Sequence, residues 1–260
     1  TPAEMVPGFV ISDQFFEEFS TDRRAGTVRD VTEYPSTLYW DLPDADLGIK
    51  LDAAWQALED YPGPYKENLE GMDNVDRDRF YAVLAPAVLT SMRPKLTLVT
   101  FYGTQSLGAH FWPYWEPQYF PDVFRQEVSR YHDILPGYYQ YLDKVLSELI
   151  TAVGPQTTVF VVSGYGMEPA IGAPDGRRAC HGNMTPGILV ASGDSIRQGF
   201  GWVERAELVD LASTILYLLG FPISNELDGR VLTEIVKEDF LLRHPIRQIP
   251  SYGPRLCITP

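Results

Sequence analysis

Short runs of consecutive apolar residues are the strongest feature of the hydrophobic pattern. Two of them, Val159–Ser163 (VFVVS) and Gly187–Ala191 (GILVA), each lead into a Ser-Gly pair. Continuous apolar runs of this length, bounded by Gly and Pro, are typical of parallel strands that are covered on both faces. We therefore predict that both are inner strands of a mostly parallel sheet, and that Leu96–Tyr102 (LTLVTFY) is a further strand. Polar residues after such strands lie at carboxyl ends, where open α/β sheets bind ligands.

Three other segments repeat apolar residues at the three- and four-residue spacing of an amphipathic helix. They are Asp76–Met92, Tyr131–Val153 and Glu207–Leu219. The first tolerates or bends at Pro86, and the last ends at Gly220, a residue that readily adopts the left-handed conformation of a helix cap. Helices and strands of this kind predict an α/β fold, a mostly parallel sheet sandwiched by helices.

The rest of the chain lacks regular periodicity. Residues 21–80 are rich in Tyr, Pro and Asp and predict a variable acidic insertion, whereas the proline-rich residues 240–260 predict an extended tail over the domain surface. A chain of 260 residues with 45% apolar content can bury one sizeable core. We therefore expect residues 1–260 to form a single domain.

Charge narrows the classes of partner. The net charge of −14 and the pI near 4.6 argue against nucleic acid or an anionic membrane surface, since both require a basic face. Residues 1–80 hold 18 Asp and Glu residues against 7 Lys and Arg residues, which indicates a solvated acidic face or, alternatively, a docking surface for a basic partner. No apolar run is long enough for a membrane span. The two cysteines, Cys180 and Cys257, could pair or remain free thiols.

Several motifs occur in a recognisable order. In chain order they are GTQSLGAHFW, YYQYLDKVLSELI, VVSGYG, a His-Gly pair, GILVASG and AELVDLASTILYLLGFPISNELDGRVL. In this order they resemble the alkaline-phosphatase superfamily, nearest its branch of type I phosphodiesterases and nucleotide pyrophosphatases. The resemblance covers most of the chain apart from residues 21–80. It implies the carboxyl-terminal part of that fold, with the amino-terminal part and its nucleophile missing, and an extracytoplasmic location.

The resemblance also implies a set of positions whose side chains bind two catalytic metal ions. At several of these positions this chain has a different residue. Where the family has Ser-Asp-His-Gly, this chain has Ser-Gly-Tyr-Gly, so Gly164 and Tyr165 replace an Asp and a His. In the GTQSLGAHFW segment, which looks like a metal-binding loop of the family, Ser106 stands where an Asp is expected, or Gln105 in an alternative alignment. A phenol at Tyr165 is protonated at neutral pH, and we expect it to fill the metal cavity.

Only His110 and His181 match ligand positions of the resemblance. Two neutral imidazoles without a carboxylate form a weak site, because each lost charged ligand removes attraction for a divalent ion. We interpret both as vestigial, hydrogen-bonded remnants and expect no cofactor; a single Zn²⁺ at low occupancy is the alternative. Glu168, Asp175 and Asp194 are close in sequence, but we do not expect them to restore the site.

Together these features predict a non-catalytic phosphodiesterase-like domain, a structural or interaction subunit with no catalytic residue of its own. Because the amino-terminal strands are expected to be missing, the sheet would have an incomplete edge that another polypeptide covers. The competing hypothesis is a metal-dependent phosphodiesterase or phosphatase whose nucleophile-bearing half lies on another chain or outside this sequence.

Overall fold

The computed structural model describes residues 73–171, 179–181, 185–199, 201, 203 and 205–253. They combine helices with small sheets, as an α/β fold does. Most of the predicted acidic insertion, Cys257 and the last residues of the tail lie outside the described residues. Contacts divide the chain into two compact units, and the predicted single domain stays a prediction. We call Thr1–Val153 with Pro169–Cys180 the helical unit, and Gly154–Glu168 with His181–Pro260 the carboxyl-terminal unit.

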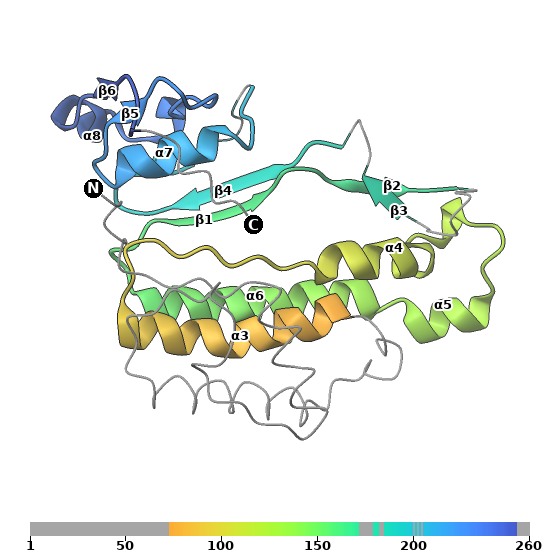
Figure 1. Ribbon diagram of the computed structural model, residues 1–260. Helices are drawn as coiled ribbons and strands as arrows, with labels where there is room; N and C mark the ends of the chain where they lie inside the picture. Colours follow the sequence, from red (N-terminus) through yellow and green to blue (C-terminus); the bar gives the residue numbers. More distant parts are fainter. Residues whose placement is uncertain are drawn as a thin grey trace. The chain divides into compact units, whose positions relative to one another are not determined.

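Up to Val153, the described part of the helical unit consists of four α-helices and one 3₁₀ turn (Figure 1). They are α3 (Asp73–Met92), α4 (Gly103–Trp115), η3 (Pro117–Tyr119), α5 (Arg125–Tyr131) and α6 (Ile134–Val153). The helix α6 packs against both α3 and α4. None of the described helices is long and apolar enough to cross a membrane.

The core of the helical unit follows the predicted apolar stripes. On α3, Phe80, Leu84 and Val88 are buried as expected, although Val83 from the same predicted stripe is 39% exposed. Pro86 lies inside α3, so the helix tolerates it. A second cluster joins the start of α3 to α4 and α6, and its buried members are Val75, Leu107, Phe111, Ile134, Leu135 and Tyr138.

Two sequence predictions fail in this unit. The expected strand Leu96–Tyr102 has no partner among the described residues and is not a strand, and Leu98 is 79% exposed. β-branched and aromatic residues favour an extended backbone. A strand also needs a neighbouring strand to complete its hydrogen bonds, and local propensity does not determine whether such a neighbour is present. The segment that resembled a metal-binding loop is instead the helix α4, because Leu107 and Phe111 lie four residues apart and are both buried.

The carboxyl-terminal unit contains short strands and helices. Its first sheet pairs β1 (Val159–Ser163) with β4 (Ile188–Ser192). In the connection between them β2 (Met167–Pro169) pairs with β3 (Ala179–His181), and the boundary between the two units falls within both of these short strands. After β4 come α7 (Asp210–Leu218), β5 (Ile223–Ser224), η4 (Thr233–Ile235), α8 (Glu238–Arg243) and β6 (Gln248–Ile249). The strands β5 and β6 are parallel.

The predicted parallel arrangement of the two inner strands is wrong. Both strands form where expected, but β1 and β4 are antiparallel, with Val159 opposite Ser192 and Ser163 opposite Ile188. A parallel pair needs a crossover connection, usually a helix, whereas here the connection carries the short ladder of β2 and β3. The strands are also not covered on both faces, since Ile188 and Val190 are 56% and 57% exposed. An apolar run thus identified the strands but not their direction.

The helix α7 matches its prediction more closely. It ends at Leu218, and Gly220 follows with φ of +82°, the left-handed conformation expected of the cap. Tyr217 of α7 belongs to a core cluster with buried Leu232 and Val236. The predicted extended tail begins later than expected, because Phe240–Arg243 belong to α8. The prolines that favour an extended chain start only at residue 245, so they gave no reason to exclude a helix over the preceding residues.

Candidate functional site

The helix α4 carries the first group of predicted site residues. Ser106 is half-buried and Gln105 and His110 are exposed. Because Ser106 and His110 lie one helical turn apart, the ring nitrogen Nδ1 of His110 is 2.8 Å from the main-chain oxygen of Ser106. This contact fixes the ring on the helix surface and directs its other nitrogen, Nε2, away from that carbonyl.

The hydroxyl of Ser106 has a partner on another helix. The side-chain amide of Asn74 on α3 donates to Ser106 Oγ at 2.7 Å. The position where the resemblance expects a metal-binding carboxylate therefore holds a neutral hydroxyl that accepts a hydrogen bond from α3. Its role in this structure is to join two helices.

The second group follows β1. Ser163 Oγ donates to the main-chain oxygen of Tyr165 at 2.7 Å and so closes the turn after the strand. Tyr165 is 45% exposed, and the expected filling of a metal cavity by its ring stays a prediction. A Cβ built at Gly164 would lie 3.5 Å from Leu208 Cδ2, which is an ordinary contact. Residue 164 therefore has room for a Cβ atom.

The two predicted ligand histidines belong to different units. His110 is in the helical unit, whereas His181, the last residue of β3, belongs to the carboxyl-terminal unit. Neither the side chain of His181 nor Asp175 is described. Within the described ranges, no three His, Cys, Asp or Glu side chains are grouped in a way that could hold a metal ion. Cys180 is a free thiol there, and its pairing with Cys257 lies outside what the structure describes.

The structure shows a buried carboxyl that the sequence reading missed. Asp78 on α3 has no exposed surface, and its oxygens accept hydrogen bonds from the N–H groups of Tyr102 (2.9 Å) and Gly103 (2.7 Å) and from the hydroxyl of Tyr138. A sequence signal existed, because Asp78 lies three residues after the buried Val75 and so falls on the buried face of α3. The carboxyl is closed to substrates but holds the first turn of α4.

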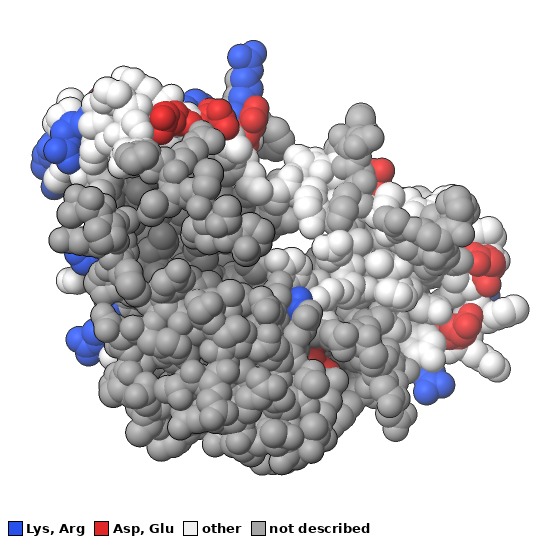
Figure 2. Space-filling model, in the orientation of Figure 1, with Lys and Arg blue, Asp and Glu red and all other residues white. Residues whose placement is uncertain are grey.

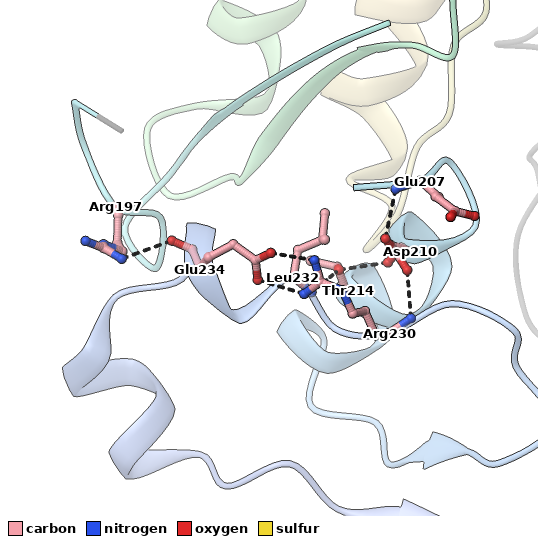
Figure 3. Close-up of polar contacts among 7 residues, drawn as sticks. All are labelled: Arg197, Glu207, Asp210, Thr214, Arg230, Leu232 and Glu234. Carbon is pink, nitrogen blue, oxygen red and sulfur yellow. Dashed lines mark hydrogen bonds and ion pairs between the residues drawn. The ribbon is translucent and has the colours of Figure 1, made fainter. Parts of the chain in front are cut away.

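A polar network in the carboxyl-terminal unit holds the segment after β5 on α7 (Figure 3). Asp210 is 5% exposed and accepts hydrogen bonds from the N–H groups of Glu207 (2.9 Å) and Arg230 (2.8 Å). Thr214, with no exposed surface, donates to the main-chain oxygen of Asp210 at 2.8 Å and accepts from the N–H of Leu232 at 3.0 Å. All of these groups satisfy each other, so the network is a scaffold.

The surface end of this network carries ionic contacts. Arg230 binds both carboxylate oxygens of Glu234, at 2.9 Å and 2.6 Å, and Arg197 donates to the main-chain oxygen of Glu234 at 3.1 Å. The hydrogen bond from Arg230 lowers the pKa of Glu234, and the same contact raises the pKa of Arg230. On the face shown in Figure 2, acidic and basic side chains both lie among uncharged residues of the described part.

Comparison with known proteins adds one finding to this geometry. The sequence profile of the family described as type I phosphodiesterase / nucleotide pyrophosphatase matches residues 22–178, which is 157 of the 260 residues. The match includes α4 and β1, and so the positions of Ser106, His110, Gly164 and Tyr165. Neither the curated proteins nor the solved structures gave a match.

Proposed function

Because the chain belongs to the type I phosphodiesterase / nucleotide pyrophosphatase family, we propose that it is a non-catalytic member which serves as a structural or interaction subunit. The observation that carries this proposal is the set of residues at the metal positions. Ser106, Gly164 and Tyr165 stand where the resemblance expects two aspartates and a histidine.

The chemistry of these side chains supports the proposal. Two divalent cations held close together need several anionic or imidazole ligands, which offset the charge of the ions and exclude water. The hydroxyl of Ser106, the hydrogen atom of Gly164 and the phenol of Tyr165 do not supply the carboxylate and imidazole ligands that the resemblance expects. The hydroxyl of Ser106 is moreover the acceptor of the Asn74 amide. This donor set does not fit a metal pair.

Loss of such ligands would remove a large part of phosphoester catalysis. Cations in these sites stabilise charge on the transferring phosphoryl group, and contributions of this kind are each worth orders of magnitude in rate. Groups that act as a unit are not lost additively, so three substitutions need not cost more than one. Loss of the ligands at one metal position is therefore sufficient to abolish most of the catalysis.

A second candidate function follows from family membership itself, since the family is a class of phosphoric ester hydrolases. In this alternative the protein is a metal-dependent phosphodiesterase or phosphatase whose nucleophile is supplied by another polypeptide segment. It requires carboxylates from elsewhere to replace those absent at Ser106 and Gly164.

An activity assay separates the two candidates. The full native chain would be supplied with Zn²⁺ or Mn²⁺ and tested on bis(4-nitrophenyl) phosphate. We expect the rate to equal that of His110→Ala and His181→Ala variants and of metal in buffer. Turnover above these controls that is abolished by His181→Ala would overturn the proposal in favour of the enzyme.

The proposed partner is another polypeptide that covers the sheet of β1 and β4. In the described part of the chain, β1 is the neighbour of β4 in this sheet, and the apolar side chains of Ile188 and Val190 are more than half exposed. An open strand edge with exposed apolar residues favours association with another chain. Analytical ultracentrifugation of the isolated chain should show association, and a stable monomer would count against this part of the proposal.

A further inference from the structure

Asp78 is a fully buried carboxyl that connects three helices. It lies on α3 and accepts hydrogen bonds from the N–H groups of Tyr102, the N-cap residue of α4, and Gly103, the first residue of α4. The hydroxyl of Tyr138 comes from α6. Its exposed surface is 0%. Few positions in a protein combine full burial of a carboxyl with contacts to so many separate elements, because a buried charge is costly unless it is well satisfied.

Among the residues that the structure describes, the groups around Asp78 offer little opposite charge. From α4 it meets backbone N–H groups, and from α6 the phenol of Tyr138, with Tyr141 close to that ring. Arg77 on α3 is the cation that favours its charged form, whereas Arg79 acts on Tyr138. Burial outweighs the hydrogen bonds and Arg77 and raises the pKa of Asp78. Burial and the neighbouring carboxylate likewise raise the pKa of Tyr138, which stays protonated.

The hydrogen-bond geometry leaves a place for a proton on this carboxyl. Oδ2 accepts two donors, the N–H of Gly103 and the hydroxyl of Tyr138, whereas Oδ1 accepts only the N–H of Tyr102 within the described contacts. A carboxylate oxygen can accept two hydrogen bonds, so a proton fits on the second lone pair of Oδ1. The neutral acid then keeps Oδ2 as a carbonyl acceptor for both of its donors.

We propose that Asp78 is a proton-linked anchor of α4, whose carboxyl takes up a proton as the pH falls and thereby holds α4 more firmly to α3 and α6. The sign follows from linkage. A folded state that binds a proton more tightly than the unfolded chain gains stability as the pH falls through its own pKa, until the unfolded chain is protonated as well. Between the two values, each pH unit changes the folding equilibrium constant by up to about tenfold. The proposal is independent of whether the protein is catalytic.

Unfolding by urea between pH 4 and pH 8 tests the anchor in the full chain. The variants are Asp78→Asn and, as a matched control on the same helix, Asp76→Asn, whose side chain is 41% exposed and paired with Arg79. Both variants replace an aspartate of α3 by asparagine and remove the same ionisable group from the unfolded chain, so the control accounts for that change. We expect wild type and Asp76→Asn to gain stability on acidification relative to Asp78→Asn, by up to about tenfold per pH unit. Parallel profiles of wild type and Asp78→Asn would overturn the proposal.

A measurement on the wild type alone keeps the test decisive if Asp78→Asn does not fold. Carbon-13 NMR of the labelled carboxyl groups follows the titration of Asp78 directly. The expected midpoint is above the ordinary value of 3.8. A midpoint at or below 3.8 in the folded protein would refute the anchor, because the folded state would then bind the proton no more tightly than the unfolded chain.

Discussion

Replacement of Thr214 by valine tests whether the network on α7 stabilises the carboxyl-terminal unit. Valine has nearly the same shape as threonine but no hydroxyl, so Thr214→Val leaves the N–H of Leu232 without its acceptor. Thr214 is fully buried and water cannot replace that acceptor. A buried donor left unsatisfied costs about 1–3 kcal/mol, and the main-chain oxygen of Asp210 also loses a hydrogen bond. The added methyl group is apolar and offsets part of this loss.

The chain offers a matched control for this substitution. Thr151 on α6 makes the same kind of bond to the carbonyl four residues earlier, from Oγ1 to Ser147 at 2.8 Å, but it is exposed. Thr151→Val should change the free energy of unfolding by less than about 0.5 kcal/mol. Urea unfolding gives the free energies, and hydrogen exchange of the Leu232 amide reports the local effect. Equal stability of the two variants, with unchanged exchange at Leu232, would refute the reasoning.

Three further predictions concern other contacts. Leu107→Ala, at a position with no exposed surface on α4, should cost about 2–5 kcal/mol in thermal or urea unfolding, and a loss below 1 kcal/mol would mean that the cluster is not tightly packed. Gly103→Ala should destabilise the protein by about 1–3 kcal/mol, because its Cβ would collide with a tyrosine hydroxyl of α6. Gly201→Ala, with open space around it, is the control and should be tolerated. Equal effects of the two substitutions on the melting temperature would exclude this cause. Arg230→Gln should cost less than about 1 kcal/mol, since the pair with Glu234 is partly exposed. The lowered pKa of Glu234 means that this small contribution is present near neutral pH and lost as the pH falls through the folded-state value, so pH-independent stability differences would contradict it.

Periodicity predicted three of the described α-helices, α3, α6 and α7, but missed α4, α5 and α8. The sequence placed helices over α6 and α7, because a stripe of apolar residues at helical spacing is a local property of the chain. It also predicted both strands β1 and β4 to within one residue. It did not predict that they are antiparallel, because direction depends on the intervening chain, and β2 and β3 turn that chain back on itself.

The site was partly predictable. The motifs placed Ser106 and His110 on one segment and identified the family, which the profile match confirms. Motif order did not reveal that this segment is a helix, nor that the Ser106 hydroxyl binds Asn74, a contact between residues 32 positions apart. The role of Asp78 was missed for the same reason, since its partner Tyr138 lies 60 residues away. Long-range polar contacts depend on helix packing, which local patterns do not encode.

The proposed loss of the metal centre is tested most directly by Zn²⁺ stoichiometry. Wild type would be compared with a variant that combines Ser106→Asp, Gly164→Asp and Tyr165→His, after equilibrium dialysis and elemental analysis. A Cβ atom at residue 164 would make only an ordinary contact, so Gly164→Asp causes no collision at that atom. We expect fewer than two Zn²⁺ ions per wild-type chain and a higher number in the combined variant. Two Zn²⁺ ions bound to the wild type, with one or both lost in His110→Ala, would contradict it.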